Sequence, residues 1–469
     1  MNIKLYCYIY RIYLQMRNVA KTVLRGRQAD LDYLFVDLKE SDFDETGILK
    51  CSVTGDDCYI DGHSTKYPIK KDELFPIENL VTNASIAKQY SKSYRNKRKE
   101  KPSYTHDVES AVKLWPLFLV NSRIPDGYKY AGLSYAGYIE EYEEWCLPSW
   151  IWTNAAVVRY YCMADQIDEA LQLGKVILQY QVQGKGWIVR NDYGVKNIKP
   201  LLAPNDSAYI ANNACLEIYK KTKIQEYLDA AIECADWIIE TARQDGMVYF
   251  GYDTFSDQWE TDHNIVDVGF TAGLFAELYE ITNNNKYSNF ARKFTETYIK
   301  LFFDKEKGRF WSSIGLNDKP RGTGFSRGQA WALEGLIPVY KWLGDETIKP
   351  IINSTVQHLI RTQNKDGSWP RELDNPNLGP DCKGTPVIAY SLHKWLTEGL
   401  LERELYEAAS KAVSNALQWC GQHTAENGNG LGGIYSFCYE GAIVHHPFTS
   451  TAFAYSSAYA LELYYMSKG

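Results

Sequence analysis

Two kinds of apolar pattern alternate along the chain from about residue 103 onward. The first kind is apolar on nearly every face, as in TAGLFAELYEI after residue 270 and TAFAYSSAYALELYY after residue 450. A helix that is apolar all round is buried on all sides, so these segments predict inner helices. The six segments of this kind begin near Ser149, Asp206, Asp267, Arg327, Pro386 and Thr451.

The second kind of pattern is a one-sided apolar stripe. In residues 224–239 the apolar side chains recur at i, i+3, i+4 and i+7, which predicts an amphipathic helix on the outside of the fold. Such a stripe follows each of the first five inner segments. The sixth outer helix is expected from Asp107 to Ser122, beside the last inner helix near Tyr455–Tyr465.

A short loop that joins a glycine to an aromatic residue marks the repeat. Its successive glycines lie 59, 60, 62, 59 and 66 residues apart, at Gly127, Gly186, Gly246, Gly308, Gly367 and Gly433. A period near sixty accommodates two helices of about 17 residues and two loops. The prediction is an all-α (α/α)6 toroid over residues 103–469, a closed ring of six helical hairpins. An open solenoid is the alternative.

Residues 1–102 lie outside this repeat and are predicted to form an N-terminal extension. Residues 30–80 contain short β-like stretches such as CSVTG and DCYIDG. The basic run at 88–101 predicts a solvated linker. Residues 1–27 carry six basic and no acidic residues, and a helix there would have a basic face opposite an apolar one. In one interpretation the apolar face packs on the toroid and the basic face is solvated. In the other, the helix makes weak contact with an anionic membrane surface.

Charge and cysteine usage narrow the class of protein. The net charge of −7 gives no reason to expect nucleic acid as a partner, and no run of 18 apolar residues predicts a membrane span. The ten cysteines are scattered and form no C-x-x-C pair, which indicates reduced thiols and a cytoplasmic protein. The sequence does not determine the oligomeric state. The 36 tyrosines and 13 tryptophans suit either a carbohydrate cleft or a large aromatic core.

Two carboxylates stand at equivalent places in the repeat. Asp206 and Asp267 lie 61 residues apart at the starts of neighbouring inner helices, and Gln329 follows 62 residues later. The starts of all inner helices meet at one end of a toroid, so these side chains are expected to converge. Paired carboxylates in a cleft are suited to acid–base chemistry on sugars, although an aspartate at a helix start also serves as a cap.

Other side chains near this end are predicted to bind substrate. Arg327 can hold a carboxylate in a bidentate fork, and tryptophans can stack on a sugar ring. His263 precedes Asp267 by four residues and could orient it. No cluster has metal-ligand spacing, and no cofactor is expected. The residues predicted in this way to bind substrate are Arg327, Trp331, Trp150, Trp152, His263, Trp369 and His446.

The run Ser326-Arg327-Gly328-Gln329-Ala330-Trp331 resembles the unsaturated glucuronyl hydrolases and the related unsaturated rhamnogalacturonyl hydrolases. The resemblance covers about residues 145–469 and implies the (α/α)6 fold and a substrate with a 4,5-unsaturated uronic acid. It also implies that Asp267 is the main catalytic acid/base and Asp206 its partner, and that Gln329, Arg327 and a tryptophan of the first inner helix bind substrate. The chain departs from the family in having Asn205, which is also predicted to bind substrate, where a histidine is usual. Its fifth inner helix also begins Gly384-Thr385-Pro386 in place of a serine-rich run.

The resulting expectation is a glycoside hydrolase that hydrates the C4–C5 double bond of an unsaturated uronide at the end of an oligosaccharide. Two alternatives stay open. One is another uronide-active toroid enzyme, such as an inverting glycosidase or an epimerase. The other is a non-catalytic glycan-binding protein of polysaccharide metabolism.

Overall fold

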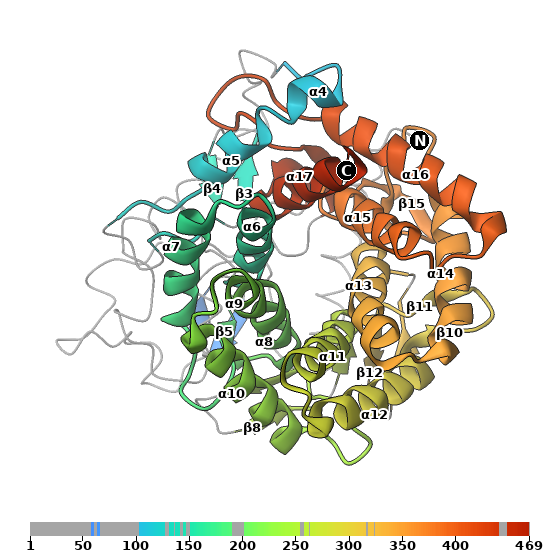
Figure 1. The fold of residues 1–469 in the computed structure, drawn as a ribbon. Helices are drawn as coiled ribbons and strands as arrows, with labels where there is room; N and C mark the ends of the chain where they lie inside the picture. The colour runs from blue at the N-terminus through green and yellow to red at the C-terminus, as the bar shows by residue number, and fades with distance from the viewer. Residues whose placement is uncertain are drawn as a thin grey trace.

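Helices form a closed double ring in a computed structural model of the chain (Figure 1). The structure describes residues 58–60, 63–65, 103–126, 131–135, 137–140, 144–146, 151–189, 201–253, 258–261, 263–315, 318–322, 324–439 and 448–468. The predicted all-α (α/α)6 toroid is confirmed, and the strands that accompany the helices are short.

The inner ring consists of six helical segments that surround the centre of the molecule (Figure 1). They are α6 (Ile151–Met163), α8 (Pro204–Ile210) continued by the π-helix η4 (Ala211–Leu216) and α9 (Glu217–Thr222), the 3-10 turn η5 (Val266–Gly269) continued by α11 (Phe270–Thr282), α13 (Ser326–Leu343), α15 (Gly384–Thr397) and α17 (Ala454–Lys468). Each begins within three residues of its predicted start. Apart from their ends, these segments are buried on nearly every face, as their apolar pattern predicts.

The outer ring covers the inner one with amphipathic helices. They are α7 (Ile167–Leu178), α10 (Gln225–Thr241), α12 (Asn285–Phe302), α14 (Lys349–Thr362) after the 3-10 turn η7 (Glu346–Ile348), and α16 (Arg403–Gln422). The predicted helix 224–239 corresponds to α10. The prediction of a single helix at 107–122 is wrong. This segment forms two short helices, α4 (Val108–Ala111) and α5 (Trp115–Asn121), because Pro116 in the first turn of α5 cannot donate the backbone hydrogen bond that a continuous helix needs.

Short strands gather at the end of the ring where the inner helices begin. Each lies in the connection between an outer helix and the next inner helix, so the strands build the mouth of the toroid. They are β3 (Gly137–Ile139), β4 (Glu144–Cys146), β5 (Ile188–Val189), β6 (Leu201–Leu202), β7 (Gly251–Asp253), β8 (Gln258–Glu260), β9 (His263–Ile265), β10 (Phe303–Asp304), β11 (Arg309–Phe310), β12 (Ser313–Gly315), β13 (Pro320–Arg321), β14 (Pro370–Glu372), β15 (Asn375–Pro380), β16 (Ser436–Tyr439) and β17 (Phe448–Ala452).

One of these sheets closes the ring. Its strand order is β16-β17-β3-β4, and all its pairs are antiparallel. The pair β17–β3 places Thr451 opposite Ile139 and so joins the connection before the last inner helix to the connection before the first. Below it, α17 packs against both α5 and α6. The ring is therefore closed by main-chain hydrogen bonds as well as by helix packing, and the open-solenoid alternative is wrong.

Few residues before 103 are described. Strands β1 (Cys58–Ile60) and β2 (His63–Thr65) pair as an antiparallel hairpin, which confirms β-structure in the DCYIDG stretch. Residues 1–27, with their predicted amphipathic helix, and the basic run 88–101 lie outside the described residues. Over the described part of the chain, no helix combines the length and the apolar character needed to cross a membrane.

Candidate active site

The two predicted catalytic aspartates lie on neighbouring inner segments at the mouth of the ring. Asp206 is the third residue of α8, and Asp267 is the second residue of the 3-10 turn η5 that leads into α11. Both segments pack against each other. The N-cap positions belong to Ala203 and Ile265, so neither carboxylate is the helix cap that the capping interpretation required.

Asn205 connects the two carboxylates. Its Nδ2 donates to Asp206 Oδ1 at 3.2 Å, and its hydrogen bonding also favours the charged form of Asp267. Two oxygens of this group are buried without a hydrogen-bond partner among the described residues: Asn205 Oδ1 and Asp267 Oδ1. Since buried polar atoms are nearly always paired, these two are expected to be completed by a bound molecule.

Burial raises the pKa of both carboxyls. For Asp267, which is 8% exposed, loss of hydration is the largest cause, and repulsion from the neighbouring Asp206 adds to it, so its pKa lies well above the usual range. Loss of hydration also raises the pKa of Asp206. Two like charges this close are hard to ionise together, so the pair retains a proton at pH values where an exposed aspartate has none. One carboxyl can then act as acid and the other as anion.

The SRGQAW run builds the wall beside this pair. Arg327 is buried, and its Nε lies 3.1 Å from Oδ2 of Asp381, a residue just before α15 that the sequence analysis did not select. Gly328 lies against Val266, the neighbour of Asp267, and a Cβ at this position would be only 2.1 Å from Val266 Cγ1. The glycine therefore allows η5 to approach α13 closely and sets the position of Asp267.

Gln329 has a place different from the one predicted. It is fully buried, its Oε1 accepts from the Phe310 N–H at 2.7 Å, and its Nε2 donates to the carbonyl oxygens of Phe310 and Phe325. It is the fourth residue of α13, as Ser207 is the fourth of α8, and Ser207 Oγ accepts from the Trp187 N–H in the same way. Gln329 thus corresponds to Ser207, one residue past Asp206, and ties a repeat loop to its inner helix.

Trp369 is likewise part of the framework. Its ring is fully buried, its Nε1 donates to Leu359 O at 2.8 Å, and its N–H donates to Thr385 Oγ1. The buried ring leaves no face for a sugar, and the amide of Gln329 is used by the backbone. We therefore do not keep either residue among the substrate contacts.

Trp152 and Trp331 form an aromatic cluster next to the aspartates. Their rings lie edge to face with centroids 6.0 Å apart, and Trp331 Nε1 donates to the Tyr455 hydroxyl at 2.9 Å. Tyr209, one turn after Asp206, also packs edge to face on Trp152, with ring centroids 5.7 Å apart. Trp152 keeps part of its surface exposed, whereas Trp331 is 5% exposed. Of the two, Trp152 is better placed to stack on a bound sugar.

Three predicted site residues are not described at side-chain level. Trp150 and His446 lie outside the described residues. His263 belongs to β9, which pairs with β12, and only its backbone is described. Their predicted contacts with substrate stay predictions.

The sequence of the inner and outer rings matches a known protein family. The family model described as Glycosyl Hydrolase Family 88 matches residues 147–464, which include both aspartates and the SRGQAW run. The chain belongs to Glycosyl Hydrolase Family 88. It is thereby a glycoside hydrolase by family, which disfavours the non-catalytic alternative.

Individual relatives of this family 88 chain are distant. It is 21% identical over 234 residues to the unsaturated chondroitin disaccharide hydrolase of Streptococcus pneumoniae (strain ATCC BAA-255 / R6), covering 45% of this chain and 58% of that protein. It is 29% identical over 178 residues to the unsaturated 3S-rhamnoglycuronyl hydrolase of Formosa agariphila, covering 34% of this chain and 46% of that protein. The matched segment thus spans about half the length of these curated relatives.

Solved structures support the fold. A structure of an unsaturated glucuronyl hydrolase specific for heparin matches with a TM-score of 0.59 at 15% identity, covering 76% of this chain and 96% of that one. The cellobiose 2-epimerase of Bacillus thermoamylovorans B4167 matches with a TM-score of 0.60 at 12% identity, covering 77% and 98%. At these identities the likeness concerns the fold, and it does not distinguish hydrolase from epimerase.

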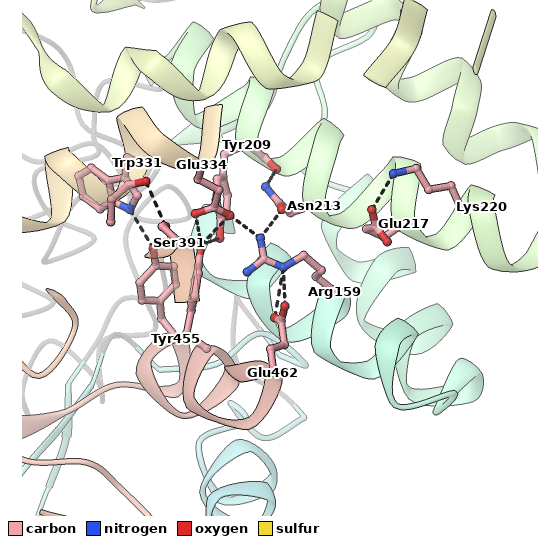
Figure 2. A network of polar contacts seen from close by, with 12 residues as sticks. Arg159, Tyr209, Asn213, Glu217, Lys220, Trp331, Glu334, Ser391, Tyr455 and Glu462 are labelled. Atoms are coloured by element: carbon pink, nitrogen blue, oxygen red, sulfur yellow. Dashed lines mark hydrogen bonds and ion pairs between the residues drawn. The ribbon is translucent and has the colours of Figure 1, made fainter. Parts of the chain in front are cut away.

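Beneath the aromatic cluster, the family 88 chain buries a charged network that the sequence analysis missed (Figure 2). Arg159 on α6 bonds Glu462 on α17 through Nε at 2.9 Å, and its Nη1 donates to Glu334 and to Asn213. The Tyr459 hydroxyl bonds Glu334. One signal could have revealed it: an arginine inside the otherwise apolar run AAVVRYYC requires a buried partner.

This network ties the inner ring together below the mouth. The Tyr209 and Tyr459 hydroxyls lie 2.8 Å apart, and Tyr209 is on the same helix as Asp206. Asn213, within the π-helix η4, contributes its Oδ1 to Arg159. A π-helical turn inside an α-helix is often found at functional sites. Here it brings Asn213 to the network and so connects the helix that carries Asp206 to its neighbours.

Proposed function

We propose that this family 88 protein hydrates the C4–C5 double bond of a terminal unsaturated uronic acid and so releases the next sugar of an oligosaccharide. The observation that carries the proposal is the buried Asp267 beside Asp206, with a pKa raised by burial and by its neighbour. A carboxyl that keeps its proton near neutral pH is suited to general acid catalysis. Two curated relatives are named unsaturated chondroitin disaccharide hydrolase and unsaturated 3S-rhamnoglycuronyl hydrolase, and these names support the same substrate class.

In the proposed reaction Asp267 donates its proton to C4, and water attacks C5. Asp267 then takes a proton from that water, so the residue ends as it began. The resulting hemiketal opens and releases the neighbouring sugar. Asp206 stays charged and holds the water or the substrate hydroxyls. Because the double bond is protonated and the glycosidic oxygen is not, one acid/base residue suffices.

The aromatic and basic residues of the mouth are assigned supporting roles. Trp152 would stack on a sugar ring, and Trp331 would support it from behind through the contact between their rings. Arg327 would contribute positive charge for the uronate, although it shares that charge with Asp381. A cytoplasmic location is part of the proposal. It is supported by the free, buried thiols of Cys162, Cys215, Cys234 and Cys420.

The assay is the loss of ultraviolet absorbance of unsaturated disaccharides prepared with polysaccharide lyases. Wild-type protein is expected to remove it, and Asp267→Asn is expected to abolish it. Asp236→Asn, on the exposed side of α10, is the matched control and should keep wild-type activity. Full activity of Asp267→Asn would refute the assignment. Turnover of saturated but not unsaturated oligosaccharides would instead support the inverting-glycosidase or epimerase alternative.

A further inference from the structure

Asn205 is placed to act on both aspartates of the mouth. The residue is 2% exposed, and its Nδ2 donates to Asp206 Oδ1 at 3.2 Å. Asn205 also lowers the pKa of Asp267, but burial and the charge of Asp206 each raise that pKa by more. An amide N–H can only donate, and its bond is strongest when the acceptor carries a negative charge. The amide also does not titrate, so its preference for an ionised Asp206 is the same at every pH.

We propose that Asn205 is a positioning residue that keeps Asp206 as the anion of the pair and so leaves the shared proton on Asp267. The inference rests on the proposed function, for which it explains how two neighbouring aspartates acquire different roles. Asp267 Oδ1 is buried and has no partner among the described residues, so it is the oxygen to which we assign the proton. Without the amide, the Asp206 anion would lose the hydrogen bond that stabilises it and would take up the proton more readily.

The ionisable groups nearest the pair keep one charge state across neutral pH. Glu462, whose pKa burial raises to about 7, is bonded to Arg159 and to neither aspartate. The hydroxyls of Tyr298 on α12 and Tyr209 on α8 have their pKa raised by burial and stay neutral. The buried charged side chains on the elements packed against α8 and η5 are paired: Arg327 on α13 with Asp381, and Arg159 on α6 with Glu334 and Glu462. The distribution of the proton is therefore decided within the group of Asn205, Asp206 and Asp267.

The experiment is a titration of the aspartate carboxyl carbons by NMR in the full chain, without substrate. Signals are assigned with Asp206→Asn and Asp267→Asn, and the test variant is Asn205→Ala. The matched control is Asn264→Ala. Asn264 is also a buried asparagine close to Asp267 in the chain, but its Nδ2 donates to Val248 O at 2.8 Å. In the wild type, Asp206 is expected to ionise at lower pH than Asp267.

Removing the Asn205 amide is expected to make Asp206 a weaker acid by about tenfold or more, the usual effect of losing a hydrogen bond to a charged group. Asn264→Ala should leave both titrations unchanged. Two results would overturn the proposal: an unchanged Asp206 titration in Asn205→Ala, or an Asp267 that ionises before Asp206 in the wild type.

The titration tests the role of Asn205 and the activity assay tests the proposed function, so either proposal can fail without the other. If the wild type leaves unsaturated disaccharides intact, the proposed function fails while the titration still tests Asn205. If turnover is observed, the acid limb of the kcat/KM profile should move to higher pH in Asn205→Ala. A merely structural role would lower kcat/KM by the same factor at every pH without moving the limb, and that result would contradict the proposal.

Discussion

Arg327 Nε lies 3.1 Å from Asp381 Oδ2, and the two side chains are 4% and 1% exposed. Removing one partner leaves the other as an uncompensated buried charge, so Arg327→Met or Asp381→Leu should each lower the free energy of unfolding by about 3–5 kcal/mol. The double variant should lose clearly less than the sum. Urea denaturation of the four proteins measures this coupling, and additive losses would mean that the two side chains do not stabilise each other.

Gln329 and Ser207 each hold a repeat loop against an inner helix, and we expect both to contribute to stability and not to substrate binding. Gln329→Leu and Ser207→Ala each leave a backbone N–H without its partner, of Phe310 in one case and of Trp187 in the other. Each should therefore destabilise the fold by about 1–3 kcal/mol. The KM of an active preparation should stay within about twofold of wild type. A large rise in KM for Gln329→Leu without loss of stability would restore Gln329 as a substrate contact.

Gly328→Ala should disturb the aspartate pair through Val266. Alanine normally stabilises a helix relative to glycine by about 0.5–1 kcal/mol, but here the new Cβ would lie 2.1 Å from Val266 Cγ1. We expect a destabilisation of about 1–3 kcal/mol together with a fall in kcat. The control is Gly273→Ala on α11, where a Cβ meets nothing closer than 3.5 Å. Val266→Ala in the Gly328→Ala background should recover part of the kcat, and no recovery would exclude this contact as the cause.

The raised pKa values of the aspartates give stability a defined pH dependence. The folded protein holds protons on this pair that the unfolded chain releases near pH 4, so the free energy of unfolding should fall as pH rises from about 4 towards the raised pKa values. Asp267→Asn removes an ionisable group of this kind. Its unfolding free energy should therefore decline less between pH 4 and 8 than that of the wild type. Parallel curves for the two proteins would contradict the raised pKa of Asp267.

The repeat in the sequence was enough to predict the ring and the aspartate pair, because helix starts one period apart must meet at one end of a toroid. It did not fix the residue-level register. The inner helices begin in different ways: α8 begins at Pro204, α11 follows a 3-10 turn, and α13 begins at Ser326. A spacing of 62 residues from Asp267 therefore led to Gln329, although Gln329 corresponds to Ser207 and not to Asp206. An error of one residue on a helix turns a side chain by about 100°.

Contacts between distant repeats were not predictable from the period. The pairing of Arg327 with Asp381 and of Arg159 with Glu462 depends on which faces of separate inner helices meet. Composition gave a partial signal, since arginine in an apolar helix requires a partner, but no local pattern identifies that partner. The same holds for Asn205, whose proposed role depends on its contacts with the two carboxyls and not on its own surroundings in the sequence.

The pairing of β17 with β3 also constrains how the protein can be made. The partners of this strand pair, such as Thr451 and Ile139, are separated by most of the chain. During translation the first hairpins must leave the ribosome and wait with an unsatisfied strand edge and an uncovered α5 until the last inner helix has been synthesised. Such late, long-range closure slows folding and exposes nascent chains to aggregation. Chaperone demand during synthesis is thus a consequence of the seam itself.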